Sequence, residues 1–318
     1  MTSHHFRQKT PRPLNAIIEK IYRKVQHGYQ QKIRPHLQLW RVHRLIGFWL
    51  LLWPGLWALL LAQPAEQGLP FFWIGLFIVG AFFMRSAGCA INDIWDQKFD
   101  GKVSRTCTRP LPQGLLTTRA ALISCGVALL GAGCTWLILP HNVQLLSLWA
   151  IPFVVIYPLI KRVSHWPQLF LGLTFNWSIL MGWCLSAPLD MTALLLYSSG
   201  VLWTLAYDTI YAVQDRQDDQ RIGLKSLALK MGDRVKVFSL ICMGTASLLL
   251  ISCAIIQASP DFTPLVILSL SLLSLLLAWN TVSLLSIDLD KPGDCHQYFL
   301  QQGWIGGGVF MVLLLQRF

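Results

Sequence analysis

Apolar residues are gathered into long stretches along this chain, and polar and charged residues collect between them. Most stretches hold roughly 18 to 24 residues, and a helix of that length crosses a hydrocarbon core of about 30 Å. The pattern predicts an all-α polytopic membrane protein with about nine transmembrane helices. The stretches are residues 45–62, 69–91, 119–139, 142–160, 168–187, 191–213, 235–256, 264–287 and 303–316.

The composition and the distribution of basic residues agree with a place in the lipid bilayer. Of the 318 residues, 54% are hydrophobic and only 13% are charged, about half the charged share of a typical soluble domain. Lys and Arg crowd the connections near 92–119, 161–162 and 214–236, whereas the connections 63–68 and 186–190 have none. Cytoplasmic loops are enriched in these bases. We therefore expect the N-terminus and the basic loops in the cytoplasm, and the C-terminus on the opposite side.

The chain divides into a basic cytoplasmic or interfacial segment, residues 1–40, and a transmembrane domain, residues 41–318. The formal net charge of +11 could indicate nucleic-acid binding, but the bases flank membrane crossings and no basic-aromatic groove accompanies them. We expect no nucleic-acid partner. A bacterial inner membrane is the expected location. Because Glu19 is the only acid of the basic start, an organellar transit peptide and a mitochondrial inner membrane stay open as the alternative.

A polar stretch, INDIWDQKFD, follows directly on the second apolar stretch. Asn92, Asp96 and Asp100 are spaced i, i+4 and i+8, so their oxygens would lie along one stripe of a helix. Stacked like charges repel, so we expect a cation to compensate them, and hard oxygen ligands suit Mg²⁺. Asp93 projects about 100° from this stripe and is expected to orient a neighbour. Taken alone, the acids could equally belong to a solvated loop.

A second acidic stretch, YDTIYAVQDRQDDQ, ends the sixth apolar stretch on the same membrane side. Asp215 and Asp219 are spaced i, i+4, and Asp208 and Tyr211 share their face. Both acidic stretches lead into basic loops, so an apolar helix, an acidic stripe and a basic loop occur twice. This predicts two related halves that face one central cavity. Carboxylates beside bases suit a diphosphate, because Mg²⁺ bridges its oxygens while the bases take the remaining charge.

These motifs resemble those of the UbiA superfamily of intramembrane prenyltransferases. NDIWDQKFD is similar to the N-D-x-x-D-x-x-x-D motif of that superfamily, and DRQDD to its D-x-x-x-D motif. MRSAGCAINDIWDQKFDGKVSRT, RPLPQG, YPLIKR and GLKSLA resemble the 4-hydroxybenzoate polyprenyltransferases of ubiquinone biosynthesis. In TCTRPLP, Thr108 stands where these relatives commonly have Asn. The resemblance runs from about residue 40 to the C-terminus and implies a barrel-like bundle of nine helices, with a cavity open to lipid and a cytoplasmic cap.

The reaction that the resemblance implies is transfer of a polyprenyl chain from polyprenyl diphosphate to the carbon ortho to the hydroxyl of 4-hydroxybenzoate. Mg²⁺ is the implied cofactor, and enzymes of the ubiquinone pathway are candidate partners. Arg162 of YPLIKR would receive the benzoate carboxylate, whereas Lys161 is expected only to anchor the helix end. The implied metal ligands are Asn92, Asp96, Asp100, Asp215 and Asp219, whose four aspartates are the catalytic residues, and the implied substrate-binding residues are Arg105, Arg109, Arg162, Tyr211, Lys225 and Asp208.

Several interpretations stay open at this point. Arg85 lies two helical turns before Asn92 and could contact a diphosphate or extend toward the membrane surface. Another UbiA-type transferase would accept 1,4-dihydroxy-2-naphthoate, homogentisate, chlorophyllide or haem, and the acceptor pocket decides among them. From a different class of protein, a cation transporter would also place acids at helix ends, but it would not need the adjacent bases.

Overall fold

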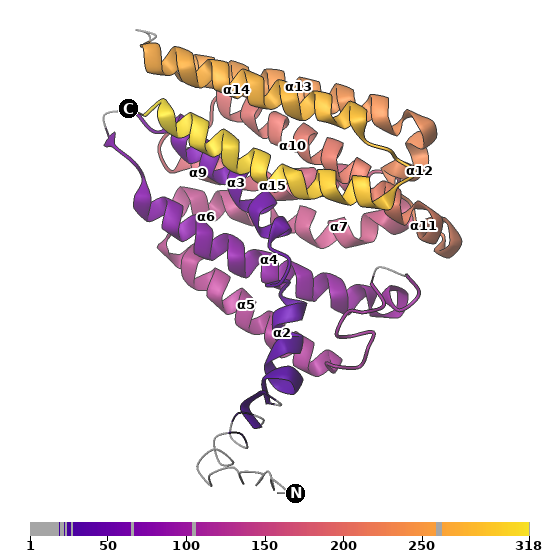
Figure 1. Cartoon of the computed structure of the whole chain (residues 1–318). Helices are drawn as coiled ribbons and strands as arrows, with labels where there is room; N and C mark the ends of the chain where they lie inside the picture. The colour runs from indigo at the N-terminus through magenta and orange to yellow at the C-terminus, as the bar shows by residue number, and fades with distance from the viewer. Residues whose placement is uncertain are drawn as a thin grey trace, which may run out of the picture.

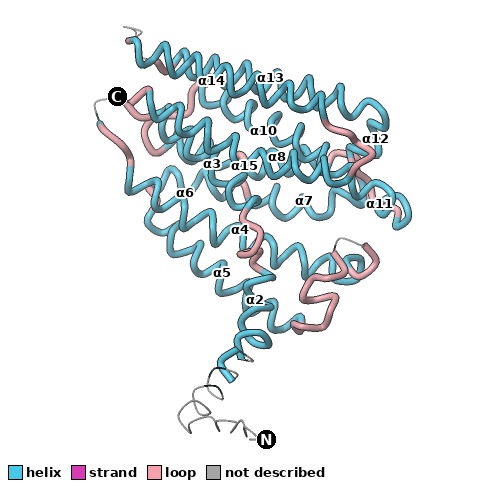
Figure 2. The backbone as a smooth tube through the Cα atoms, viewed as in Figure 1, coloured by secondary structure: helices cyan, strands magenta, loops and turns pink. Residues whose placement is uncertain are grey.

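The computed structural model describes residues 28–64, 67–103, 106–258 and 263–317, together with residues 19, 22 and 24–26. Every regular element in these residues is helical, and no strand occurs among them (Figures 1 and 2). Short π or 3-10 segments cover Tyr29–Ile33, Ala212–Asp215, Gly232–Arg234 and Leu284–Ser286. The α-helices are α2 Arg34–Leu39, α3 Ile46–Ala62, α4 Phe71–Asp100, α5 Thr118–Ile138, α6 His141–Leu148, α7 Ile151–Val163, α8 Pro167–Phe175, α9 Trp177–Cys184, α10 Met191–Tyr211, α11 Arg216–Ile222, α12 Leu227–Met231, α13 Val235–Ile256, α14 Pro264–Ser283 and α15 Pro292–Leu315.

All nine apolar stretches form helices, which confirms the all-α membrane fold. Among the described residues, six helical segments are long and apolar enough to cross a membrane, and α3 is a shorter apolar helix. The last crossing was predicted too short, because α15 begins at Pro292 and runs through the glycines. The count of nine crossings and the cytoplasmic N-terminus stay predictions, since helix length and composition alone define these crossings.

Two of the nine predicted crossings are broken into two helices each. α6 ends at Leu148 and α7 restarts at Ile151, where Pro152 occupies the first turn of the new helix. Proline lacks an N–H group and fits best in a first helical turn, where that group would have no partner in the helix. α8 and α9 meet at Asn176, whose side-chain amide donates to the carbonyl of Gly172 at 2.8 Å. These breaks lie where the helices line the interior of the bundle.

The helices form one bundle, with α13 and α14 at one edge and α4 and α5 at the opposite edge (Figure 1). α3 and α15 cross between these edges, and glycines let them approach closely. The indole N–H of Trp53 donates to the carbonyl of Gly303 at 2.9 Å, and that of Trp57 donates to Gly306 at 3.0 Å. A Cβ on Gly306 would lie 2.4 Å from the Trp53 ring. Small residues at such a seam allow close helix packing inside a membrane.

The loop after α4 and the N-terminal helix α2 cover the same end of the bundle. Leu39 of α2 is fully buried in a small apolar cluster with Ala90 of α4 and Leu111 of the loop. Thr106 donates through its hydroxyl to the carbonyl of Asp100 at 2.9 Å, which holds the loop against the end of α4. The aspartates at the C-terminal end of α4, Asp93, Asp96 and Asp100, are buried.

Candidate active site

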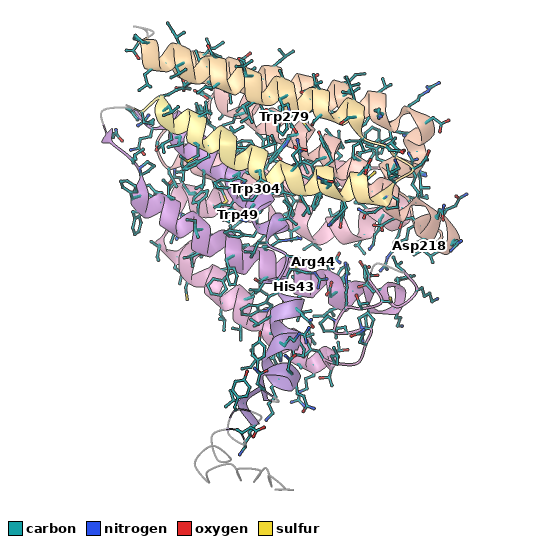
Figure 3. All side chains as sticks on the ribbon, viewed as in Figure 1. His43, Arg44, Trp49, Asp218, Trp279 and Trp304 are labelled. Carbon is teal, nitrogen blue, oxygen red and sulfur yellow. The ribbon has the colours of Figure 1, made fainter. Side chains whose placement is uncertain are left out.

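A cavity of about 1120 Å³ opens inside the bundle and is lined by both acidic stretches. The prediction that the two stretches face one cavity is therefore confirmed. Figure 3 shows His43 and Arg44 on the connector that crosses in front of α4, and both residues also line the cavity. The sequence-predicted site residues that line it are Asn92, Asp96, Asp100, Arg109, Asp208, Tyr211, Asp215 and Asp219.

The first acidic stripe has the predicted helical geometry. α4 continues without a break from the apolar stretch to Asp100, so the i, i+4, i+8 spacing places Asn92, Asp96 and Asp100 on one face. Asp96 and Asp100 are only 2% and 6% exposed. Two buried carboxylates on one face need compensating positive charge, and the chain itself supplies much of it.

Asp93 is held by two arginines from different parts of the chain. The guanidinium of Arg41 donates to both Asp93 oxygens at 2.7 and 2.8 Å, and Arg109 donates to Asp93 at 3.0 Å and to Asp100 at 2.7 Å. Arg41 adopts a left-handed backbone conformation, with φ of 58°. Burial lowers the pKa of Arg41, and the charge of Asp93 opposes this shift. Asp93 thus organises two bases beside the stripe, as its offset position suggested.

Asp96 is paired with the residue that the sequence presented only as an anchor. The ammonium of Lys161 is ion-paired with Asp96 Oδ2 and lines the cavity. Arg162 lies 3.9 Å from Asp96 Oδ1, places its guanidinium 5.2 Å from the centre of the Phe99 ring, and is not among the cavity-lining residues. Lys161 therefore lies at the cavity and Arg162 outside its lining, while the roles expected for both residues stay predictions.

The second acidic stretch does not form one continuous helical stripe. α10 ends at Tyr211, a 3-10 turn covers Ala212–Asp215, and α11 begins at Arg216. Arg216 fastens this bend, because its guanidinium donates to the carbonyls of Ala228 at 3.1 Å and Gly232 at 2.6 Å. The bend still leaves Asp208, Tyr211, Asp215 and Asp219 along one cavity wall.

Of two further expected diphosphate contacts, Arg105 and Lys225, only Lys225 belongs to the described residues, and it does not line the cavity. Arg105 lies outside the described residues, so its role stays a prediction. Lys225 is described, but its ammonium donates to the carbonyl of Val163 at 3.1 Å, and its backbone N–H donates to the carbonyl of Lys161 at 2.8 Å. Lys225 thereby covers the C-terminal end of α7, where a cation is favourable for the helix dipole.

Arg85 lies deeper in the cavity than the acids. It packs against Gly47 of α3, where a Cβ would come within 2.4 Å of its guanidinium, and lies 5.6 Å from the centre of the Phe175 ring. No described acid forms an ion pair with Arg85, and its buried Nε has no hydrogen-bond partner. A cation in this position inside a membrane needs a counter-charge.

The donor set suits Mg²⁺ shared with a substrate. Across the described residues, no group of three or more His, Cys, Asp or Glu side chains converges closely enough to hold a metal by itself. Mg²⁺ is commonly bound through one or two carboxylates together with substrate phosphates. Asp96 Oδ1 is buried and accepts no hydrogen bond, although it belongs to the acidic stripe. An acceptor in this state fits a metal ligand.

Arg41 and Lys161 are the site residues that sequence reasoning missed. Each lies at the end of an apolar stretch, where a base commonly marks the cytoplasmic membrane surface. Their acidic partners are 52 and 65 residues away in the sequence, and no local pattern links them. The spacing of Asp93 from the stripe was the only local indication that a neighbouring group would be held there.

Comparison with known proteins identifies similar sequences and folds. The sequence profile of the UbiA prenyltransferase family matches residues 51–303. The chain is 42% identical to a mitochondrial 4-hydroxybenzoate polyprenyltransferase of Caenorhabditis elegans over 86% of this chain and 76% of that protein. It is 40% identical to the human mitochondrial protein of the same name, over 89% and 75% of the two chains, and 44% identical to a 4-hydroxybenzoate octaprenyltransferase of Hydrogenovibrio crunogenus, over 65% and 73%.

Solved structures share the fold at lower sequence identity. A UbiA homologue from Aeropyrum pernix superposes with a TM-score of 0.67 at 23% identity and covers 84% of this chain and 97% of its own. A UbiA homologue from Archaeoglobus fulgidus, described as bound to GPP and Mg²⁺, gives a TM-score of 0.62 at 15% identity and covers 86% and 99%. These likenesses support the same helical membrane architecture.

Proposed function

The chain belongs to the UbiA prenyltransferase family, and we propose that it transfers a polyprenyl chain from polyprenyl diphosphate to 4-hydroxybenzoate in ubiquinone biosynthesis. The main support is that one cavity has acidic and basic side chains at one end and apolar walls along the rest. Relatives at 42% and 40% identity are named as 4-hydroxybenzoate polyprenyltransferases. The bases among the acids disfavour a cation channel.

The leaving group belongs at the acidic end of the cavity. Mg²⁺ bound there would supply a Lewis acid that neutralises the departing diphosphate. Lys161 is ion-paired with Asp96 and Arg109 with Asp100, so both bases can add positive charge next to the diphosphate oxygens as the allylic C–O bond breaks. The residues that would hold the metal are Asn92, Asp96, Asp100, Asp215 and Asp219.

The allylic carbon that develops positive charge needs a dry, electron-rich wall. Tyr211 is stacked on Phe299 with ring centres 4.1 Å apart, Tyr207 lies 5.8 Å from Phe299, and all three line the cavity. Aromatic faces attract a cation, and apolar walls exclude the water that would capture it. The ring carbon ortho to the hydroxyl then forms the new C–C bond and loses its proton, which restores the aromatic ring.

Arg85 is a second candidate for the acceptor's carboxylate, beside the expected Arg162. Arg85 lines the cavity and has no acidic partner among the described residues. Arg162 is 39% exposed in its side chain and lies beside Asp96. A planar guanidinium can hold a carboxylate through two parallel hydrogen bonds, and the position of Arg85 suits a ring that must reach the allylic carbon. The structure therefore favours Arg85.

A transfer assay in membranes tests the function. Membranes that contain the chain receive radiolabelled polyprenyl diphosphate, with and without Mg²⁺, and a panel of acceptors that includes 4-hydroxybenzoate, 1,4-dihydroxy-2-naphthoate and homogentisate. We expect label transfer to 4-hydroxybenzoate only when Mg²⁺ is present. If the label is transferred preferentially to another acceptor, that compound replaces 4-hydroxybenzoate as the proposed substrate. If no acceptor is labelled, the proposed function is wrong.

Separate kinetics for the two substrates distinguish the two arginines. We expect Arg85→Gln to raise the KM for 4-hydroxybenzoate at least tenfold, with little change for the diphosphate, and Arg85→Lys to recover part of the loss because it keeps charge without the fork. Arg162→Gln serves as the matched variant. If Arg162→Gln alone raises the benzoate KM, the carboxylate belongs to Arg162 as the motif implied.

We also propose the mitochondrial inner membrane as the location. The bacterial inner membrane expected from the sequence is not supported by the relatives, because the animal and plant proteins at 37 to 42% identity are named as mitochondrial. The basic N-terminal segment fits an organellar address. A tagged chain should fractionate with inner mitochondrial membranes, and failure to reach mitochondria in a eukaryotic cell would remove this proposal.

A further inference from the structure

The cavity extends far beyond the acids, along the membrane-embedded part of α4. Gly80 and Phe77 of α4 line it together with Asp96. The segment of α4 from Asp96 back to Gly80 is about 24 Å long at 1.5 Å per residue. A diphosphate at the acids therefore directs its isoprenoid chain along this apolar length toward the opposite membrane side.

The wall contributed by α5 changes from small to large along this direction. Ala132 and Gly133 line the cavity, and so does Trp136, which follows at i+4 and i+3 and lies on the same helix face. The small residues leave room beside α4, whereas Trp136 adds a large side chain to the same face one turn further on. Leu129 lines the cavity nearer the acids, so Trp136 is the first aromatic group that a chain running along α5 meets.

Hydrogen bonds hold this indole in one orientation. Its Nε1–H donates to the hydroxyl of Ser147 at 2.8 Å, and that hydroxyl donates to the carbonyl of Gln144 at 2.6 Å. The Gln144 side-chain amide donates back to the carbonyl of Trp136 at 3.2 Å, which closes a ring of contacts between the end of α5 and α6. Polar groups at membrane depth strongly prefer such internal partners. The ring therefore makes Trp136 a fixed obstacle.

We propose that Trp136, held by Ser147 and Gln144, sets the length of isoprenoid chain that the cavity accommodates in a straight path. This inference rests on the proposed prenyl transfer. Short chains end before the indole and do not contact it. Longer chains must bend at the indole or leave the bundle sideways, which costs binding free energy, so removal of the ring would extend the straight path for long chains only.

The test compares prenyl donors of increasing length at saturating 4-hydroxybenzoate. For the wild-type chain and each variant, kcat/KM is measured with geranyl, geranylgeranyl and octaprenyl diphosphate. We expect Trp136→Ala to raise the octaprenyl-to-geranyl ratio about tenfold, within the range by which apolar pockets discriminate substrates. Ser147→Ala should shift the ratio in the same direction by a smaller factor, because the indole is loosened and not removed.

Two further variants separate chain selection from a general packing effect. Trp149→Ala removes an indole that is 71% exposed and does not line the cavity, and it should leave the ratio unchanged. Trp136→Phe keeps most of the bulk without the N–H group, so its octaprenyl-to-geranyl ratio should lie between those of the wild-type chain and Trp136→Ala. This variant also serves as the test if Trp136→Ala fails to fold. An equal loss for every donor, or an unchanged or lowered octaprenyl-to-geranyl ratio, would overturn the inference. A wild-type chain inactive with all donors would instead defeat the proposed function.

Discussion

The ammonium of Lys161, at the end of α7, is ion-paired with the carboxylate of Asp96 on α4. The side chain of Asp96 is 3% exposed and that of Lys161 is 26% exposed, so the pair lies at the inner edge of the cavity. The contact joins the middle of the chain to the first acidic stripe and gives the polar end of the cavity both signs of charge. Its energetic and catalytic contributions can be measured separately.

Replacement of Lys161 should impair use of the diphosphate. Lys161→Gln removes a positive charge beside the leaving group, and we expect kcat/KM for polyprenyl diphosphate to fall about 100-fold, the size of effect typical of one electrostatic contact to developing charge. Lys230→Gln is the matched control, because Lys230 lies over the Trp166 ring and does not line the cavity. Equal kinetics of the two variants would contradict a role for Lys161 at the site.

The acids of both stretches should be needed for turnover with Mg²⁺. Asp96→Asn and Asp215→Asn should each lower kcat by a factor of about 100 to 1,000, because charge that develops as the C–O bond breaks loses its stabilisation. EDTA should abolish activity of the unmodified chain and added Mg²⁺ should restore it. Asp218→Asn is the control, since Asp218 does not line the cavity. Normal kcat in both site variants would remove the metal assignment.

Loss of Arg41 should destabilise the fold around α4. Arg41→Ala leaves Asp93, which is 1% exposed, with one of its two arginines, and breaking a buried ion pair costs about 3 to 5 kcal/mol. We expect a lower thermal unfolding midpoint in detergent. The double variant Arg41→Ala with Asp93→Asn should recover part of the loss, because it no longer buries an under-compensated charge. If both variants unfold at the temperature of the unmodified chain, the ion pair of Arg41 and Asp93 contributes little to stability.

The predicted orientation can be tested at Cys107, which is exposed in the loop after α4. In a bacterial inner membrane and a background without the other cysteines, a membrane-impermeant thiol reagent should label Cys107 in inverted vesicles but not in intact cells. A cysteine placed at Gln67, in the base-free connection between α3 and α4, should show the reverse pattern. Labelling of Cys107 from outside would reverse the topology and place the cavity's polar end on the other side.

Arg317 should stabilise the opposite end of the bundle. Its guanidinium donates to the carbonyls of Gln63 and Leu60 at the end of α3, where a cation also favours the helix dipole. Arg317→Ala should lower the free energy of unfolding by about 1.5 to 3 kcal/mol, as for the loss of a hydrogen bond from a charged group. Arg221→Ala, which removes a side chain that is 76% exposed, should have little effect on the unfolding midpoint. A similar midpoint for both variants would argue against this cap.

The sequence by itself determined the helical membrane class, the acidic stripe and the family. These properties are local: apolar stretches of membrane length predict helices, and the i, i+4, i+8 spacing of Asn92, Asp96 and Asp100 keeps its meaning because α4 runs straight through it. The family resemblance likewise depends on short contiguous motifs. Each of these features could be predicted from the sequence because it depends only on residues that are neighbours in the chain.

Only the tertiary structure decided which charges meet. Lys161 was expected only to anchor a helix end and Arg41 was not singled out, yet they are paired with Asp96 and Asp93. Lys225 was expected at the diphosphate but covers the end of α7. The breaks inside two crossings and the bend after Tyr211 also depend on packing. Such pairings join residues far apart in the chain, and a buried carboxylate takes whichever cation the fold brings within reach, because leaving it uncompensated is costly.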